Sequence, residues 1–268
     1  MMNRHVLITG ASRGIGAAIA LAFARQGDHV GINYRFDREG ARKVCDEAQG
    51  IGVQASIYQA DVGNAEQVEE MFSAFIEEFK TIDVLVNNAG GGLKIPEGGF
   101  EKMPLSYWNE MIALNLNGAA YCSSFAVKNM KENGIKGAII NISSVHSVIT
   151  YVKRKTFPYC AAKAGLNMLT KTMGVDVIRL GIRVNAIAPG FISTSATTRY
   201  NKEELDAFLR KIPAGRLGNT QDITPLVLFL ADPEKSGFIV GQTFVVDGGQ
   251  SIDGTIDYML LEEQNGKE

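Results

Sequence analysis

Short apolar runs alternate with amphipathic segments along most of the chain, and no other feature of the sequence limits the fold as strongly. A short apolar run between turn residues is typical of a buried strand, whereas apolar residues three and four positions apart form one face of a helix. Seven runs predict strands, at residues 5–9, 29–34, 53–60, 82–86, 137–142, 182–187 and 243–246. Helices are predicted between them, at residues 37–49, 105–130, 159–180, 202–211 and 221–231, with two more described next.

The clearest helix pattern runs from Asn64, a predicted N-cap, to Phe79. Its apolar stripe consists of Val68, Met71, Phe72, Phe75, Ile76 and Phe79. Another helix is predicted to follow Gly16 and to end near Gly27, because glycine often follows the last turn of a helix. Asp37 is the predicted N-cap of the helix at 37–49.

This order of strand, helix and strand with short connections predicts a parallel sheet, because parallel neighbours need crossover connections. Crossovers of one hand place helices on both faces, so we expect an α/β, Rossmann-type, doubly wound sheet of seven strands. The sequence of 268 residues contains no obvious linker or repeat. We therefore expect one domain over 1–268 that carries both the cofactor and the substrate sites, with a substrate loop at about 190–220 and a short tail at about 251–268.

A glycine-rich segment, TGASRGIG at 9–16, lies between the first predicted strand and the first predicted helix. Gly10, Gly14 and Gly16 allow a tight turn and a close approach of the backbone to a ligand. The N-terminus of the following helix would then stabilise the negative charge of a pyrophosphate. This arrangement predicts a dinucleotide site.

The end of the second strand distinguishes the two nicotinamide cofactors, because an acidic residue there would bind the ribose hydroxyls of NAD. Instead the chain has Asn33, Tyr34 and Arg35, with no acid before Asp37. Arg35 and Arg13 could together hold a 2′-phosphate. We therefore expect NADP(H) to be favoured, with NAD(H) or dual use as the main alternative.

Several further motifs follow in a fixed order. They are Asp61-Val62, Asn87-Asn88-Ala89-Gly90, Asn115 in NLNG, Ser144 in NISS, Tyr159 and Lys163 in YCAAK, and Pro189-Gly190 in APG. Together with the glycine-rich segment, this set resembles the short-chain dehydrogenase/reductase family over about residues 4–250. The resemblance implies that Asn115, Ser144, Tyr159 and Lys163 are catalytic. It also implies a cofactor site that includes Gly10, Ser12, Arg13, Gly14, Ile15, Gly16, Asp61, Val62, Asn88, Ala89, Gly90, Tyr159, Lys163, Pro189, Gly190, Ile192 and Thr194.

Elementary chemistry supports the catalytic assignment. Tyr159 and Lys163 are four residues apart and so share one helix face. A nearby ammonium is expected to lower the pKa of the phenol, which could then exchange a proton with a substrate oxygen while hydride moves to or from nicotinamide. Ser144 could hold the substrate oxygen, and Asn115 could position a water molecule that links Lys163 to solvent.

The segment between Ser144 and Tyr159 is a little longer than the family usually has, which leaves Ser143 as a fallback for Ser144. It carries His146, a possible substrate contact, and the basic residues Lys153, Arg154 and Lys155. These charges suit an anionic substrate, but solvated loop charges or a subunit contact are the simpler interpretation. Cys160 is expected to be a packed thiol. No metal site is predicted.

The overall charge and the cysteines set limits on partners and location. A net charge of −2 gives no general attraction to nucleic acid or to anionic membranes. The three cysteines form no CxxC pair, no apolar run approaches membrane-spanning length, and no signal peptide is evident. We therefore expect a soluble, cytoplasmic protein with a small-molecule substrate and no nucleic-acid or membrane partner.

The expected activity is NAD(P)(H)-dependent interconversion of a secondary alcohol, or of a sugar or polyol hydroxyl, with its carbonyl. The stretch NGIKGAIINISSVH, with NYR at strand two, is most similar to bacterial glucose 1-dehydrogenases and related enzymes. A 3-oxoacyl-carrier-protein reductase is the alternative enzyme, and a catalytically silent dinucleotide-binding regulatory protein is the alternative of another class. The resemblance further implies a homotetramer, or a homodimer, in which the helices at 105–130 and 159–180 form one interface and the C-terminal strand another.

Overall fold

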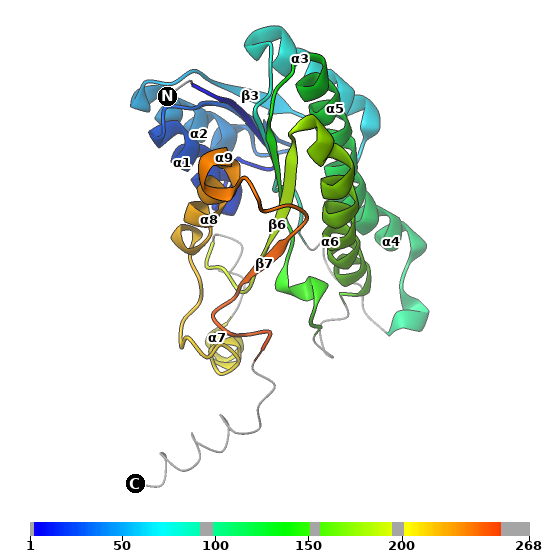
Figure 1. The fold of residues 1–268 in the computed structure, drawn as a ribbon. Helices are drawn as coiled ribbons and strands as arrows, with labels where there is room; N and C mark the ends of the chain where they lie inside the picture. Colours follow the sequence, from blue (N-terminus) through cyan, green and yellow to red (C-terminus); the bar gives the residue numbers. More distant parts are fainter. Residues whose placement is uncertain (1–2, 92–98, 151–155, 195–200, 253–268) are drawn as a thin grey trace, which may run out of the picture.

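Seven parallel strands form one sheet, as the sequence predicts, and their order in the sheet is β3-β2-β1-β4-β5-β6-β7 (Figure 1). The computed structural model describes residues 3–91, 99–150, 156–194 and 201–252. The strands are β1 (His5–Ile8), β2 (His29–Tyr34), β3 (Ala55–Gln59), β4 (Val84–Asn87), β5 (Ala138–Ile142), β6 (Arg183–Pro189) and β7 (Thr243–Val246). The strand order reverses between β1 and β4, so a crevice is expected at their carboxyl ends.

The main helices lie between these strands: α1 (Gly14–Arg25), α2 (Arg38–Ile51), α3 (Ala65–Phe79), α4 (Leu105–Ile112), α5 (Gly118–Glu132), α6 (Phe157–Val177), α7 (Lys202–Leu209), α8 (Thr224–Ala231) and the short α9 (Pro233–Ser236). Asp37 and Asn64 cap α2 and α3 as predicted, since their side chains accept hydrogen bonds from Gly40 N and Gln67 N. None of the helices within the described ranges is both long and apolar enough to cross a membrane.

The helix predicted at 105–130 is interrupted, which corrects the sequence analysis. Residues Ala113–Asn117 form a π-helical turn between α4 and α5. Turns of this kind widen the helix and are frequent at functional sites. The helix predicted at 221–231 also begins later than expected. A 3₁₀ turn at Thr220–Asp222 precedes α8, and Pro225 lies in the first turn of α8, where its missing N–H is tolerated.

Apolar side chains pack on both faces of the sheet, because successive strand residues point to opposite sides. Val6 and Ile8 of β1 pack in one cluster with residues of α1, α2 and α8. Leu7, between them, packs in the second cluster with residues of α3, α5 and α6. The domain therefore has three layers, with the sheet in the middle (Figure 1).

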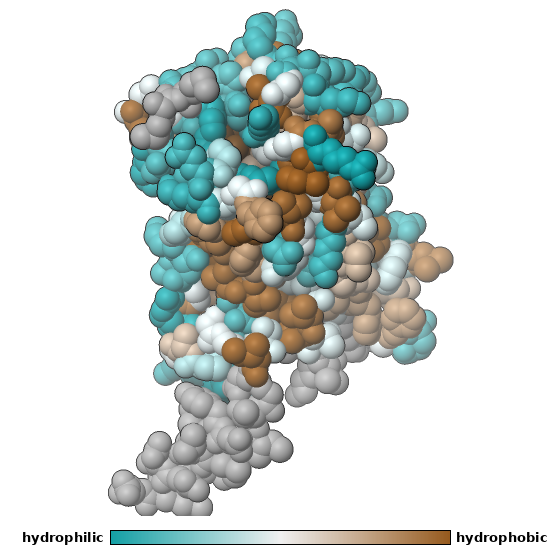
Figure 2. All heavy atoms as spheres, viewed as in Figure 1, coloured by the Kyte–Doolittle hydropathy of each residue, from teal (hydrophilic) through white to brown (hydrophobic). Residues whose placement is uncertain are grey.

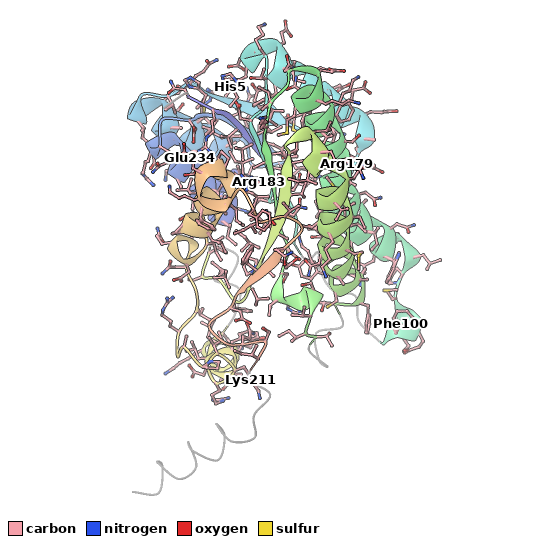
Figure 3. The ribbon with its side chains drawn as sticks, viewed as in Figure 1. His5, Phe100, Arg179, Arg183, Lys211 and Glu234 are labelled. Carbon is pink, nitrogen blue, oxygen red and sulfur yellow. The ribbon has the colours of Figure 1, made fainter. Side chains whose placement is uncertain are left out.

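One buried charge joins the sheet to the end of α8. The Arg183 guanidinium donates to Leu230 O at 2.7 Å and to Ser236 Oγ at 2.8 Å. Leu230 lies in the last turn of α8, where a cation stabilises the orphan carbonyls, and Ser236 ends α9. Arg179, which precedes it in the chain, is exposed (Figure 3).

Candidate active site

The predicted site residues gather at the carboxyl ends of β1, β4, β5 and β6, on both sides of the point where the strand order reverses. The glycine-rich segment follows β1 and opens α1. Gly10 and Gly14 have φ of +61°, which side-chain-bearing residues rarely adopt. A Cβ atom on Gly16 would lie 2.5 Å from both Gly10 O and Asn88 Nδ2. Glycine is therefore required at all three positions.

The N-terminus of α1 has the chemistry of an anion site. Its N-cap, Arg13, makes no side-chain capping bond, and its first turn contains no acidic residue. Backbone N–H groups at such a helix start favour a negatively charged ligand. The turn and the helix start thus fit a pyrophosphate, as the sequence predicts.

Two asparagine side chains, Asn88 and Asn33, form hydrogen bonds with the backbone of this turn. Asn88 Nδ2 donates to Thr9 O and Gly10 O, both at 2.9 Å. Asn33 is buried, and its Oδ1 accepts from Gly10 N at 3.0 Å while its Nδ2 donates to Tyr58 O and Ala60 O at 3.2 Å. Asn33 was predicted to contact the cofactor, and the structure places it as a support for the glycine turn. Tyr34, predicted alongside it, is also buried.

Thr9 is a site residue that the sequence analysis missed. Its Oγ1 accepts from Asn88 N at 3.0 Å and from Ala89 N at 2.9 Å. These bonds join the end of β1 to the end of β4 across the switch point. In the sequence, the only indication of this role is that a residue with a hydroxyl group comes directly before the glycine turn.

Arg35 lies at the adenosine end of the predicted site. Its Nη2 pairs with Asp61 Oδ2 at 3.0 Å, and its guanidinium carbon lies 4.5 Å from the centroid of the Phe36 ring. The Arg35 side chain remains 44% exposed, so it has room to contact a ligand. Arg13, the second predicted cation, is exposed.

Tyr159 and Ser144 meet where the N-terminal part of α6 approaches the end of β5. A side-chain hydrogen bond joins them. Burial raises the pKa of Tyr159, and the hydrogen bond from Ser144 opposes this effect less strongly. The predicted lowering of the Tyr159 pKa is therefore wrong, because withdrawal of the hydroxyl from water has the largest effect on that pKa.

Lys163 is buried one turn further along α6. Its Nζ donates to Ile142 O at 2.8 Å and lies 5.8 Å from the centroid of the Tyr159 ring. Burial lowers the pKa of Lys163 to about 8. The ammonium is thus fixed next to the phenol but is itself easily deprotonated.

Asn115 reaches the same place from the π-helical turn. Its Oδ1 accepts from Gly91 N at 2.9 Å, and its Nδ2 donates to Gly91 O at 3.1 Å and Met111 O at 3.0 Å. A Cβ atom on Gly90 would lie 2.8 Å from Asn115 Oδ1 and 3.2 Å from Lys163 Nζ. Gly90 therefore lies in close contact with the side chains of both Asn115 and Lys163. With Tyr159 and Ser144, all four predicted catalytic residues lie in one place.

The fallback residue Ser143 is turned away from Tyr159. Its Oγ donates to Asn167 Oδ1 at 2.7 Å and to Lys163 O at 3.3 Å, both on α6. Ser144 is thus the serine that contacts the phenol.

His146 flanks the tyrosine. The ring centroids of His146 and Tyr159 are 5.8 Å apart, and Cys160 Sγ lies 3.7 Å from His146 Nδ1. Cys160 also contacts the hydroxyl of Thr156 at 3.3 Å, consistent with a packed thiol. The basic residues Lys153, Arg154 and Lys155 lie outside the described residues.

The segment after β6 covers the glycine turn from the other side. Pro189 ends β6, and Gly190 N donates to Val246 O at 2.9 Å. Further along, the methyl group of Thr194 would lie 3.6 Å from a Cβ atom on Gly14. Thr194 therefore lies near the predicted pyrophosphate position. Ile192 packs against the core cluster that contains residues of α1, whereas Val62 is packed in the core below the end of β3.

Known proteins match this chain over most of its length. A family model described as enoyl-(acyl carrier protein) reductase matches residues 10–251. The 3-oxoacyl-(acyl-carrier-protein) reductase of Staphylococcus epidermidis is 38% identical over 248 residues, which are 92% of this chain and 99% of the relative. The 3beta-hydroxysteroid dehydrogenase 1 of Eggerthella lenta is 36% identical over 254 residues, which are 94% of this chain and 95% of the relative.

A solved structure agrees. The crystal structure of a short-chain type dehydrogenase/reductase from Mycobacterium marinum superposes with a TM-score of 0.85 at 32% identity, covering 92% of this chain and 95% of that one. The fold, the order of the motifs and these matches lead to one conclusion. The chain belongs to the short-chain dehydrogenase/reductase family of NAD(P)-dependent oxidoreductases.

Proposed function

We propose that this protein interconverts a secondary alcohol, or a sugar or polyol hydroxyl, with its carbonyl, and that Tyr159 is the general acid and base. The observation that carries the proposal is the convergence of Tyr159, Ser144, Lys163 and Asn115 beside the glycine turn. When bound, a nicotinamide cofactor supplies or accepts the hydride. The residues of the chain hold the reactants and move the proton.

In the reductive direction, the Tyr159 hydroxyl donates its proton to the carbonyl oxygen. Its raised pKa keeps the phenol protonated near neutral pH, which is the form that can donate. Ser144 is already hydrogen-bonded to this hydroxyl and would hold the substrate oxygen next to it. In the oxidative direction Tyr159 must first lose its proton to solvent, and its phenolate then accepts the proton of the alcohol while Ser144 holds the substrate oxygen.

Lys163 would stabilise the phenolate that remains after proton transfer. An ammonium that is buried beside a developing negative charge interacts with it more strongly than in water. Its hydrogen bond to Ile142 O and the proximity of Gly90 fix its position. Asn115, on the other side of Gly90, would position a water molecule that returns a proton from solvent.

The cofactor is proposed to bind with its pyrophosphate on the turn at Gly10–Gly16 and its adenosine beside Arg35. Because no acidic residue occupies positions 33–36, Arg35 with Arg13 favours the 2′-phosphate of NADP(H). The competing possibility is NAD(H) or dual use, since Asp61 already neutralises part of the charge of Arg35.

Arg35→Asp tests the cofactor preference. The substitution removes the cation and supplies an acid for the ribose hydroxyls, so kcat/KM for NADPH should fall by about 10² while that for NADH rises. Arg25→Asp, on the exposed surface of α1, is the control. An unchanged ratio between the two cofactors would show that Arg35 does not bind the 2′-phosphate.

A 3-oxoacyl thioester is the second candidate substrate. The match to the Staphylococcus epidermidis reductase specifically favours it. The match to a hydroxysteroid dehydrogenase adds steroids to the set to be tested. A panel of aldoses, polyols, 3-oxoacyl thioesters and hydroxysteroids, followed by nicotinamide absorbance, would separate these classes.

The same panel on Tyr159→Phe tests the mechanism. Turnover should fall by about 10³ or more because the proton donor is lost, while the Kd of the cofactor changes little. Tight cofactor binding by the unmodified chain without turnover of any substrate would instead indicate a silent binding protein. Substantial residual activity in the variant would refute the role of Tyr159.

A further inference from the structure

The segment Phe191–Thr194 is held by a second segment around Gly218. Gly218 N donates to Phe191 O at 2.9 Å, and Ser193 N donates to Gly218 O at 2.7 Å. This pair of bonds forms a short parallel bridge between Ile192 and Gly218. A Cβ atom on Gly218 would lie against the end of the Ile192 side chain, which would have to shift to make room, so the two segments are in close contact here.

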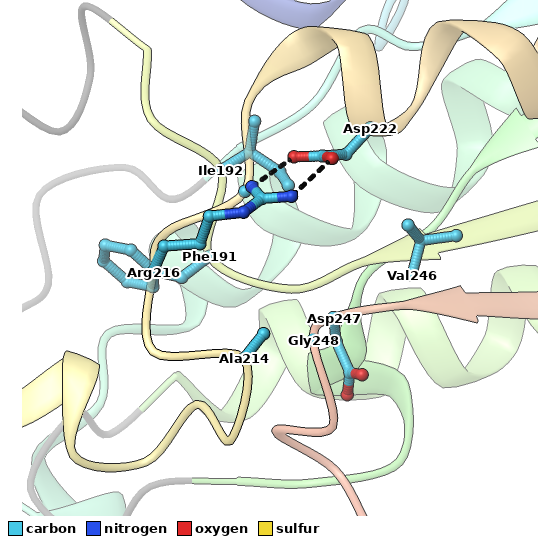
Figure 4. A pocket seen from close by; sticks show the side chains of 9 residues that line it. Phe191, Ile192, Ala214, Arg216, Asp222, Val246, Asp247 and Gly248 are labelled. Atoms are coloured by element: carbon cyan, nitrogen blue, oxygen red, sulfur yellow. Dashed lines mark hydrogen bonds and ion pairs between the residues drawn. The ribbon is translucent and has the colours of Figure 1, made fainter.

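A two-point ion pair fixes both ends of the Gly218 segment (Figure 4). Arg216 Nη1 lies 2.7 Å from Asp222 Oδ2, and Arg216 Nη2 lies 2.8 Å from Asp222 Oδ1. The same carboxylate accepts from Asn219 N at 2.7 Å, and Arg216 Nη1 also donates to Leu217 O at 3.0 Å. We call Arg216 and Asp222 the clamp. It closes a small loop, residues 216–222, that contains Gly218.

The clamp differs from an ordinary surface ion pair. Isolated exposed pairs contribute little, and Arg25–Glu47 is one of these, with a single contact at 3.2 Å. Two parallel hydrogen bonds between guanidinium and carboxylate also define the relative orientation of their segments. Because both partners of the clamp bond to the backbone of residues 217–219 as well, it restricts the loop geometry.

A cavity explains why this restriction matters. About 220 Å³ of space lies between Phe191 and Ile192 on one side and Val246 and Gly248 at the end of β7 on the other (Figure 4). Phe191 also stacks on Phe208, with ring centroids 4.2 Å apart, and Ile192 packs against the core cluster, so the cavity leaves open only the side of the segment that faces the end of β7. Without the bridge to Gly218, Phe191 and Ile192 could shift into the cavity, and Thr194 would withdraw from Gly14.

We propose that Arg216 and Asp222 are positioning residues for the cofactor. The clamp holds Gly218, Gly218 holds residues 191–194, and these residues close over the dinucleotide at the glycine turn. The inference rests on the proposed function, because it takes residues 191–194 to line the cofactor. It concerns the part of the dinucleotide beyond the adenosine, since β6 lies across the sheet from Arg35 at the end of β2.

Cofactor binding tests the clamp independently of turnover. NADPH and NADH are titrated by fluorescence against the unmodified chain, Arg216→Gln, Asp222→Asn and the double variant, together with the matching adenosine fragment (adenosine 2′,5′-bisphosphate or AMP). We expect the Kd of the preferred dinucleotide to rise about tenfold in each single variant and no further in the double variant, because each substitution removes the same ion pair. The Kd of the fragment should stay within about twofold.

Two further variants distinguish the clamp from general stabilisation. Arg216→Lys keeps one hydrogen bond and should give an intermediate Kd, whereas Arg25→Gln, which removes the isolated pair, should leave the Kd unchanged. Equal weakening of dinucleotide and fragment, or unchanged dinucleotide binding in both clamp variants, would overturn the clamp. Failure of the folded, unmodified chain to bind either dinucleotide would instead overturn the proposed function, and the clamp proposal with it.

Discussion

At the scale of single residues, burial decides the chemistry of the catalytic pair. The spacing of Tyr159 and Lys163 was enough to predict that they share a helix face, but it could not show how deeply they lie. In the folded chain burial raises the pKa of the phenol and lowers that of the ammonium. Each group is thus moved toward its neutral form, which suits a proton donor but makes the lysine costly to bury.

This cost predicts a conflict between stability and activity at Lys163. Its folded pKa of about 8 lies below the ordinary value of 10.5, so the fold disfavours the charged form. The penalty is fully present below pH 8, on the order of 3 kcal/mol, and disappears as the pH rises toward 10.5. Lys163→Met removes the penalty but leaves Ile142 O without its donor, which costs about 1 kcal/mol.

We therefore expect Lys163→Met to be inactive and yet more stable by roughly 2 kcal/mol at pH 7, with the gain lost near pH 10. Urea unfolding of the cofactor-free protein at both pH values measures this difference. Lys171→Met, at an exposed position of the same helix, should change neither stability nor its pH dependence. A gain that is equal at pH 7 and pH 10 would show that deprotonation of Lys163 is not its source.

At the scale of elements, the sequence predicted helix caps and strands where these depend on neighbouring residues. The caps Asp37 and Asn64 and the strand Thr243–Val246 follow from neighbouring residues and were predicted correctly. The π-helical turn at Ala113–Asn117 could not be predicted, because the segment LNLNG contains no proline and its pattern is that of a continuous helix. Its Asn115 amide bonds to Met111 O within the helix and to Gly91 on a distant loop, and only the fold brings that loop there.

The candidate site shows the same division. Motif order located Ser144, Tyr159 and Lys163, but the choice between Ser143 and Ser144 required the position of Asn167 on α6. Likewise, an asparagine at the end of a strand could contact either a ligand or the backbone. The structure directs Asn33 to Gly10 N, Tyr58 O and Ala60 O, partners that come from β1 and β3. Side chains that support the backbone of a site, and do not contact its ligand, therefore cannot be recognised from the sequence.

At the scale of the whole molecule, large apolar side chains remain exposed on two separate surfaces. Phe238, in the segment between α9 and the edge strand β7, is fully exposed, and Val245 of β7 is 42% exposed. Figure 2 shows apolar residues gathered over the part of the molecule around β7. On α6, Met168 and Val175 are 57% and 71% exposed and, seven residues apart, lie on one face of the helix. Exposed apolar side chains that gather on one surface are typical of interaction sites.

We propose that these are the two interfaces of a homotetramer, one across α6 and one across β7. If so, Phe238→Glu and Val175→Glu should each disrupt one interface and leave dimers, because an unpaired charge would be buried at the contact. The double variant should be monomeric, and Ile51→Glu, on the exposed end of α2, should assemble like the unmodified chain. Sedimentation velocity at micromolar concentration measures these masses. An unmodified chain that sediments as a monomer would refute the assembly. If the unmodified chain is a dimer and only one of the two single substitutions dissociates it, the protein is a homodimer that uses that surface alone.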